Sequence, residues 1–353
     1  MKLSDIGSLA LEVTSHCNIR CPQCSRINHD GEIAEYIKLK HWDIASILPN
    51  LPVDQMTNLS FVRIEGDNGD AIMHPDIVKI VEHFHNAPTK PYILILTNGS
   101  LRSTNWWQEL GERFQDRVRV QFSIDGMLDT HALYRVGADY AKTIDNVKAL
   151  IAGGGDATRR CLIFAHNQHQ LAEIKQASLD VGFGQLQIRP GDLFRFQGDT
   201  EWPVFFKGKE THRIKPIENF NVDFSEWEYN QYPVNNYRDR SVNLGLLCPG
   251  LNSGEITITY QGHLIPCCMV HTDMYFNRDF NVAYQTLVGD MDLMDLNLRT
   301  LDDILNDSEY YGHRLESMLG GDNRLAKCQS NCGEQIDNKV IKLSSRIRNS
   351  TVL

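Results

Sequence analysis

The sequence lacks both an apolar run that could cross a membrane and a low-complexity tract. A membrane-spanning helix needs about 20 consecutive apolar residues. The amino-terminal segment MKLSDIGSLALEV has no long apolar stretch after a basic start, so it does not resemble a signal peptide. From these absences we expect a cytoplasmic protein with no membrane segment.

Positive charge is also scarce. The chain has 35 Lys and Arg residues against 45 Asp and Glu, which gives a formal net charge of -10. An acidic surface repels phosphate groups, so a nucleic-acid substrate is disfavoured unless a basic groove forms locally.

Cysteine, in contrast, is plentiful, with nine residues in the chain. A reducing compartment disfavours disulfides, so clustered cysteines there indicate metal binding or redox chemistry. Cys161 stands alone in an apolar segment and is most simply a small buried side chain. The others form two groups, an early one of Cys17, Cys21 and Cys24 and a late one of Cys248, Cys267, Cys268, Cys328 and Cys332.

The first half of the chain alternates strand-like and helix-like segments. The short apolar segments typical of buried parallel strands are Leu9–Val13, Phe61–Glu65, Tyr92–Leu96, Val118–Ser123, Arg160–Phe164 and Leu186–Arg189. Apolar residues at helical spacing occur in His41–Leu48, Pro75–Phe84, Asn105–Arg113, Lys142–Ile151 and Gln170–Val181. This alternation predicts an α/β fold with a parallel sheet and right-handed crossovers. Periodicity alone leaves open whether the sheet is doubly wound or curls into a partial barrel.

The alternation divides the chain into three parts. Residues 1–197 form the alternating unit, and residues 198–247 form an aromatic, polar bridging segment that either lines a substrate pocket or packs as a covering loop. Residues 248–353 form a smaller α+β module. It is expected to contain a hairpin of Glu255–Tyr260 and His263–Pro266, a helix that starts at Leu301–Asn306, and a helical tail.

The early cysteines directly follow the first predicted strand. They therefore lie at the carboxyl end of a strand, which is the catalytic face of α/β barrels. Three thiolates spaced by three and two residues can bind three irons of a cubane cluster and leave the fourth iron open. A zinc site is the alternative, although zinc usually takes four protein ligands.

The CxxxCxxC motif of Cys17, Cys21 and Cys24 resembles the signature of the radical S-adenosylmethionine superfamily. The resemblance implies a partial (β/α)6 TIM-like barrel and a [4Fe–4S] cluster on these catalytic cysteines. It also implies that S-adenosylmethionine is cleaved to a 5′-deoxyadenosyl radical, which abstracts hydrogen from a substrate. Gln23 departs from the family pattern, in which an aromatic residue commonly precedes the third cysteine.

Polar residues at five further strand ends support this resemblance. The second strand ends in a variant of the family's Gly-Gly-Glu stretch, with Asp70 as the expected acid for the cofactor's amino group. The fourth ends in a pattern similar to Ser-x-Asp-Gly…Arg, in which an arginine meets the cofactor's carboxylate. The cofactor-binding residues that the resemblance implies are Gly66, Asn68, Gly69, Asp70, Thr97, Asn98, Ser123, Asp125, Arg135, Asn167 and Arg189.

The late cysteines resemble a Twitch domain, the short relative of the SPASM domain. The resemblance implies a second, auxiliary [4Fe–4S] cluster whose ligands are Cys248, Cys267, Cys328 and Cys332. The choice of Cys267 over Cys268 rests on the resemblance alone. A structural zinc site on the same cysteines is the alternative.

The resemblance implies a radical enzyme that acts on a small-molecule or peptide substrate. An auxiliary cluster suits net oxidation or bond formation, and the reducing electron would come from a flavodoxin- or ferredoxin-type donor. The first strand begins within ten residues of Met1, so we expect no amino-terminal leader-binding domain. This favours a small molecule, or a peptide that is delivered without such a domain. The alternatives are an RNA-modifying radical enzyme, a non-catalytic iron–sulfur electron carrier and a zinc-stabilised binding module.

Overall fold

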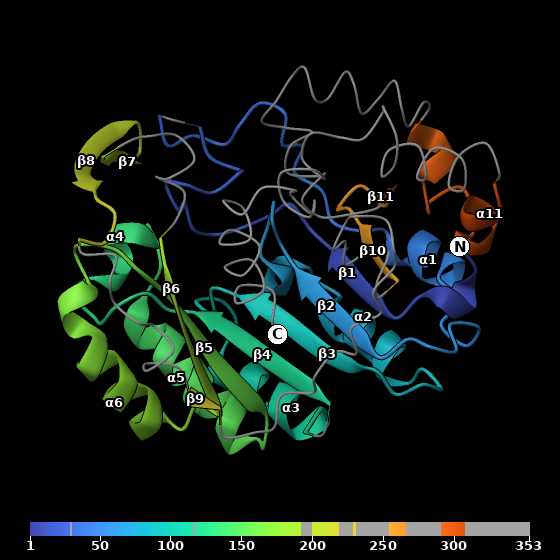
Figure 1. The fold of residues 1–353 in the computed structure, drawn as a ribbon, viewed down its shortest axis with the longest axis horizontal. Coiled ribbons are helices and arrows are strands. Elements are labelled where there is room, and N and C mark those ends of the chain that lie inside the picture. Colours follow the sequence, from blue (N-terminus) through green and yellow to red (C-terminus); the bar gives the residue numbers. More distant parts are fainter. Residues whose placement is uncertain are drawn as a thin grey trace, which may run out of the picture.

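The computed structural model describes residues 1–28, 30–115, 117–191, 200–218, 229–230, 254–265 and 291–307 of the chain. Within them, the predicted parallel sheet is confirmed (Figure 1). Its six consecutive parallel strands are β1 (Ser8–Glu12), β2 (Phe61–Glu65), β3 (Tyr92–Thr97), β4 (Val118–Ser123), β5 (Asp156–Ile163) and β6 (Gln185–Pro190). Each overlaps a strand expected from the sequence, because runs of branched apolar residues favour buried strands.

Three shorter strands extend this sheet. β10 (Glu255–Ile258) pairs in parallel with β1, and β11 (Leu264–Ile265) follows it as the second strand of the predicted hairpin. β9 (Tyr229–Asn230) runs antiparallel to β6 at the opposite edge. The order β11-β10-β1-β2-β3-β4-β5-β6-β9 leaves the two outer strands unpaired with each other, so the sheet is open. The hairpin assigned from the sequence to a separate module therefore continues the main sheet.

Helices cover one face of the sheet (Figure 1). The four long ones are α2 (Ile77–His85), α3 (Thr104–Arg113), α5 (Tyr140–Ala152) and α6 (Leu171–Val181). The short ones are α1 (Ile44–Ile47), α4 (His131–Tyr134) and α11 (Leu301–Asn306). The caps that fix their starts include Ser103, which accepts a hydrogen bond from the Trp106 amide, and Asp139, which accepts one from the Lys142 amide.

The two faces of the sheet differ in polarity. Side chains alternate along a strand, and residues such as Ile64, Ile95 and Phe122 pack in the apolar core. The opposite, inner face carries ion pairs instead, including Arg63–Glu65 at 2.6 Å and Arg119–Asp156 at 2.6 Å. A charged inner face is suited to a polar ligand rather than to packing against another apolar layer.

A hairpin of β7 (Trp202–Phe206) and β8 (Lys209–Ile214) lies in the segment expected to be a bridge. The indole of Trp202 donates a hydrogen bond to the Pro22 carbonyl at 3.1 Å, and a His212 ring nitrogen contacts the Leu133 carbonyl at 2.9 Å. The hairpin therefore covers the loop that follows β1. Sequence reasoning missed it, although Lys207–Gly208 between two strand-like runs is a signal for a tight turn with positive φ.

No helix in the described part of the chain combines the length and apolarity that a membrane span requires.

One buried arginine links β5 to the helical layer. Arg159 is completely buried and donates hydrogen bonds to the Ile124 carbonyl at 3.2 Å, the Gly126 carbonyl at 2.5 Å and the Ser178 hydroxyl at 3.3 Å. Its removal would leave these acceptors buried and unpaired.

We expect Arg159→Ala to lower the free energy of unfolding by about 3–5 kcal/mol, as measured by urea titration of the metal-free protein. The control is Arg113→Ala, which removes an exposed guanidinium paired with Glu82 and should change stability by about 0.5 kcal/mol or less. Equal effects of the two substitutions would contradict a special role for Arg159.

Candidate active site

The three early cysteines lie on the loop that follows β1, and none of them forms a disulfide. Cys21 is buried, and Cys17 and Cys24 are half-buried. The apolar residues that pack around them come from this loop, from β5, from the α4 region and from the hairpin, namely Ile19, Tyr134, Val136, Phe164, Trp202, Val204 and Ile214. These residues give the three cysteines an apolar surrounding.

The loop is fixed by hydrogen bonds to two neighbouring segments and by one within the loop. The Asn18 side chain donates to the Ser100 hydroxyl at 2.9 Å, beyond β3. The Arg20 amide donates to the Val136 carbonyl at 2.9 Å, beyond α4. The buried Arg26 guanidinium donates to the Ser15 carbonyl at 3.0 Å within the loop. The cysteines therefore occupy defined positions.

The donor set fits a positively charged iron–sulfur centre. Burial raises the pKa of the Cys21 thiol to about 11 and also raises the pKa of the Cys17 and Cys24 thiols, so a metal must replace their protons. Side-chain N–H groups then point at sulfur: Asn98 Nδ2 lies 3.8 Å from Cys17 Sγ, and Arg135 Nη1 lies 3.7 Å from Cys21 Sγ. Such donors stabilise thiolates and tune a cluster.

A cluster and a zinc ion require different spacings of the three cysteines. Among the residues that the structure describes, no three His, Cys, Asp or Glu side chains converge closely enough to bind one metal ion. In a cubane cluster each cysteine binds a different iron, so its three thiolates need not converge. The choice between a cluster and a zinc ion at this loop therefore stays a prediction.

The loop after β2 packs directly against the cysteine loop. A Cβ atom on Gly69 would lie 2.1 Å from the Thr14 carbonyl oxygen, and one on Gly66 would lie 2.1 Å from the Gly69 oxygen. The Asp70 amide donates to the His16 carbonyl at 2.8 Å. Glycine is thus required at both positions because backbone meets backbone there.

Asp70 joins this loop to the end of β3. Its buried carboxylate accepts hydrogen bonds from the Thr97 hydroxyl at 2.8 Å and from both the amide and the side chain of Asn98 at 2.6 Å. Burial raises the pKa of Asp70, which these donors oppose. The structure thus brings together Cys17, Asp70, Thr97 and Asn98, and Asp70 fixes the strand ends in relation to the cysteine loop. Its contact with the cofactor's amino group stays a prediction.

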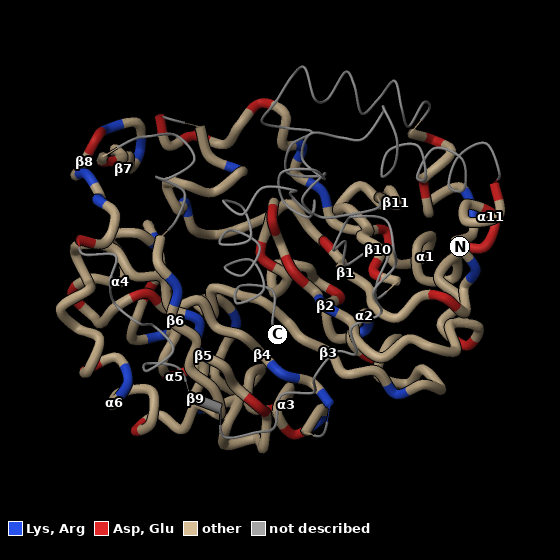
Figure 2. Tube along the Cα trace, viewed as in Figure 1, with Lys and Arg blue, Asp and Glu red and all other residues tan. Residues whose placement is uncertain are grey.

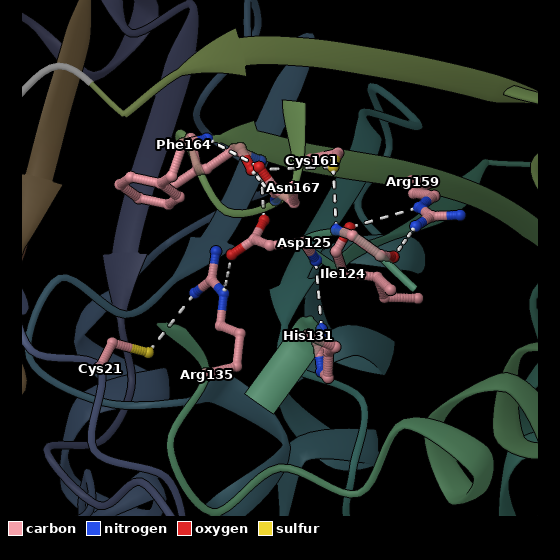
Figure 3. A network of polar contacts seen from close by, with 11 residues as sticks. Cys21, Ile124, Asp125, His131, Arg135, Arg159, Cys161, Phe164 and Asn167 are labelled. Atoms are coloured by element: carbon pink, nitrogen blue, oxygen red, sulfur yellow. Dashed lines mark hydrogen bonds and ion pairs between the residues drawn. The ribbon is translucent and has the colours of Figure 1, made fainter. Parts of the chain in front are cut away.

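A second network centres on Asp125, at the end of β4 (Figure 3). Its completely buried carboxylate accepts hydrogen bonds from Arg135 Nε at 2.6 Å and from the Leu162 amide at 2.7 Å. Burial alone would lower the pKa of Arg135, but the charges of Asp125 and Cys21 raise it well above its usual value. Arg135 is thus a permanent cation whose Nη1 reaches Cys21.

Asn167 completes the end of β5 (Figure 3). Its side-chain oxygen accepts a hydrogen bond from the Phe164 amide at 2.8 Å, and its nitrogen donates to the Leu162 carbonyl at 3.0 Å. Both polar atoms of this buried side chain therefore shape the strand end. Cys161 is fully buried, as predicted, and its sulfur accepts a hydrogen bond from the Gly126 amide at 3.4 Å.

Three further predicted residues have other partners, although Asn68 also accepts a hydrogen bond from the hydroxyl of Ser25, next to Cys24, at 3.3 Å. Asn68 bonds to Glu12 at 3.3 Å, Ser123 lies half-buried at the end of β4, and Arg189 donates to the Ile188 carbonyl at 2.9 Å. The predicted auxiliary ligands Cys248, Cys267, Cys328 and Cys332, together with Cys268, lie outside the described residues.

Sequence reasoning missed several residues that build this edge. Glu12 is completely buried at the end of β1, Asn18 ties the cysteine loop to Ser100, and Trp202 covers the loop. A carboxylate within the apolar run Leu9–Val13 was a usable signal for Glu12, because a buried charge requires partners. Trp202 belongs to the aromatic bridging segment that was expected to line a pocket or to pack as a covering loop, but its partner could not be predicted. Nothing local marked Asn18.

The chain is similar in sequence to several known proteins. No protein-family model matches it. It is 21% identical over 183 residues to the PqqA peptide cyclase of Bradyrhizobium diazoefficiens, covering 51% of this chain and 45% of the relative. It is 33% identical over 117 residues to a probable GTP 3′,8-cyclase of Methanothermobacter thermautotrophicus, covering 33% of this chain and 35% of the relative. The chain thus spans less than half of the length of either relative.

The fold is also found among solved structures. Streptococcus suis SuiB bound to the precursor peptide SuiA matches with a TM-score of 0.56 at 13% identity, over 94% of this chain and 71% of that chain. The fold and the cysteine-lined strand edge define an α/β partial-barrel protein, as expected from the sequence. The resemblance of the chain to the radical S-adenosylmethionine superfamily is confirmed.

His131 gives the site a measurable pH signature. Its buried ring accepts a hydrogen bond from the Asp125 amide at 3.2 Å, and burial lowers its pKa to about 4 even though the Asp125 charge opposes this. Between pH 6.5 and 4 the unfolded chain therefore binds a proton at His131 that the folded protein does not bind, so stability falls as the pH falls.

We expect the metal-free wild type to lose about 3 kcal/mol more stability than His131→Gln between pH 7 and pH 4, in urea titrations at the two pH values. Glutamine keeps a hydrogen-bond acceptor but does not titrate. The same pH dependence in both proteins would show that His131 is not the buried neutral group.

Proposed function

We propose that the chain is a radical S-adenosylmethionine enzyme that modifies a peptide. The proposal rests on one observation: three cysteines without disulfides and two polar networks lie at the same edge of the sheet. The networks are those of Asp70 with Asn98 and of Asp125 with Arg135. A carrier of electrons would need only the cysteines. The polar networks provide the additional groups that a zwitterionic cofactor requires.

Each group of residues has a separate task in this proposal. Cys17, Cys21 and Cys24 bind the [4Fe–4S] cluster, and Arg135 pairs with the carboxylate of S-adenosylmethionine while Asp125 orients its guanidinium. When bound, the cluster and S-adenosylmethionine would supply the 5′-deoxyadenosyl radical. The apolar residues around the cysteines, Trp202 and Phe164 among them, exclude water from that reaction.

A peptide substrate is supported by the relatives. The Bradyrhizobium relative is named a peptide cyclase, and a solved structure of SuiB contains its precursor peptide SuiA. Net oxidation or bond formation is the proposed outcome, with an auxiliary [4Fe–4S] cluster on Cys248, Cys267, Cys328 and Cys332 as the electron acceptor and a flavodoxin- or ferredoxin-type protein as the reductant. We place this chemistry in the cytoplasm.

A small-molecule substrate is the second candidate. It is favoured by the relative with the higher identity, which is named as a probable GTP 3′,8-cyclase.

The test is to purify the protein without oxygen, count iron and sulfide, and measure 5′-deoxyadenosine after addition of dithionite and S-adenosylmethionine. We expect about eight irons in the wild type. A variant with Cys17, Cys21 and Cys24 replaced by Ala should retain about four irons and form no 5′-deoxyadenosine.

A second variant tests the auxiliary cluster independently of the cluster on the early cysteines. Replacement of Cys248, Cys267, Cys328 and Cys332 by Ala should also leave about four irons, while 5′-deoxyadenosine still forms. Replacement of Cys161 by Ala is the control and should leave the iron count unchanged. Zinc without iron, together with no 5′-deoxyadenosine from the wild type, would overturn the proposal.

A further inference from the structure

Arg160 is a charged residue on the inner face of the sheet that the proposed chemistry does not use. Its predecessor Arg159 points outward, since it bonds to the Ser178 hydroxyl on α6. Side chains alternate along a strand, so Arg160 points inward. Its strand neighbours in register are Ser123 of β4 and Gln187 of β6, both polar and uncharged.

Two other arginines of the inner face, Arg63 and Arg119, have carboxylate partners, as does Arg135, which follows α4. Arg63 pairs with Glu65 at 2.6 Å, Arg119 pairs with Asp156 at 2.6 Å, and Arg135 pairs with Asp125 at 2.6 Å. For the guanidinium of Arg160, the described part of the chain provides neither an ion pair nor a hydrogen bond. Among the residues that the structure describes, it is thus an inner-face cation without an ion-pair partner.

The surroundings make this cation costly. Burial lowers the pKa of Arg160, the charge of Arg135 lowers it further, and Asp125 and Glu65 offset this only in part. Burial and the charge of Arg160 likewise lower the pKa of Arg189 on the next strand. A desolvated cation is destabilising unless an anion compensates it. Figure 2 shows the charged positions along the strands of the sheet.

The distance of Arg160 from the strand ends, measured along β5, suits the binding of a substrate group. The Leu162 amide, which binds Asp125, is two residues further along β5, and a strand rises about 3.3 Å per residue. Arg160 is therefore about 7 Å below the Asp125–Arg135 pair on the inner face. A ligand group at that depth is within reach of a molecule whose reacting atom lies at the strand ends.

We propose that Arg160 binds a carboxylate of the peptide substrate, in an inference that rests on the proposed function. Its planar guanidinium can donate two parallel hydrogen bonds to one carboxylate. Its register neighbours, Ser123 on β4 and Gln187 on β6, carry no charge that would compete with it for this carboxylate. The cofactor's carboxylate has a separate cation in Arg135.

The experiment uses the anaerobically reconstituted holoenzyme with S-adenosylmethionine bound. Titration calorimetry would measure four probes: acetyl-Gly-Glu-Gly-amide, its glutamine counterpart, acetyl-triglycine with a free carboxylate, and GTP. The proteins are the wild type, R160Q, R160K and the control R113Q, which removes an exposed arginine on the outer helix α3. The KM for S-adenosylmethionine in 5′-deoxyadenosine formation is measured for each.

We expect the wild type and R113Q to bind a carboxylate peptide at least about tenfold more tightly than the glutamine peptide, the ratio expected for a charge-assisted hydrogen bond. R160Q should lose this preference, R160K should keep part of it, and the KM should change by about twofold or less in every variant. Preference for the glutamate peptide identifies an acidic side chain as the bound group, whereas preference for acetyl-triglycine identifies a chain terminus.

Three results would overturn the inference. Equal binding of the glutamate, terminal-carboxylate and glutamine peptides by the wild type would show that no carboxylate is recognised. A tenfold rise in the KM of R160Q and R160K would assign Arg160 to the cofactor, and tighter Arg160-dependent binding of GTP would assign it to phosphate. Failure of the proposed function is distinguishable, because the wild type would then form no 5′-deoxyadenosine whatever the peptides do.

Discussion

The organisation of the site depends on one buried carboxylate, that of Asp125. It accepts a hydrogen bond from the Leu162 amide of β5 and pairs with Arg135, which in turn reaches Cys21. Two adjacent strands and the cysteine loop are thereby joined at one point. Removal of one partner from such a buried pair costs about 3–5 kcal/mol, since the other charge is left uncompensated. The geometry around Cys21 is therefore as fixed as the core beneath it.

The sheet supports this arrangement by separating its two faces. Apolar side chains pack under the helices, while charged side chains line the inner face in pairs. Asp70 repeats on β2 and β3 what Asp125 does on β4 and β5, because each carboxylate ties a loop to a neighbouring strand end. The hairpin then covers the cysteine loop through Trp202. Protein dipoles and charges are thus in place before any ligand arrives, which is the condition for electrostatic preorganisation.

Much of this edge was predictable from the sequence, but the tasks of individual residues were not. Asp70 and Asn167 were identified as site residues from their place at strand ends, yet their polar atoms are engaged by amides and carbonyls of the protein. A motif locates a residue at the edge, whereas its partners depend on how the loops pack. Arg160 shows the reverse case. It lies within a predicted strand, and only the three-dimensional structure shows that the described residues give its guanidinium no ion pair.

By itself, the sequence determined the six parallel strands, the helices between them and the location of the cysteines at a strand end. These features follow from local apolar periodicity and from the spacing of residues within one loop. Tertiary structure alone decided that β10 joins β1, that Trp202 covers the cysteine loop, and that Arg135 rather than another cation reaches Cys21. Such contacts join residues more than 100 positions apart, and their energies arise from burial and charge pairing that exist only after the chain has folded.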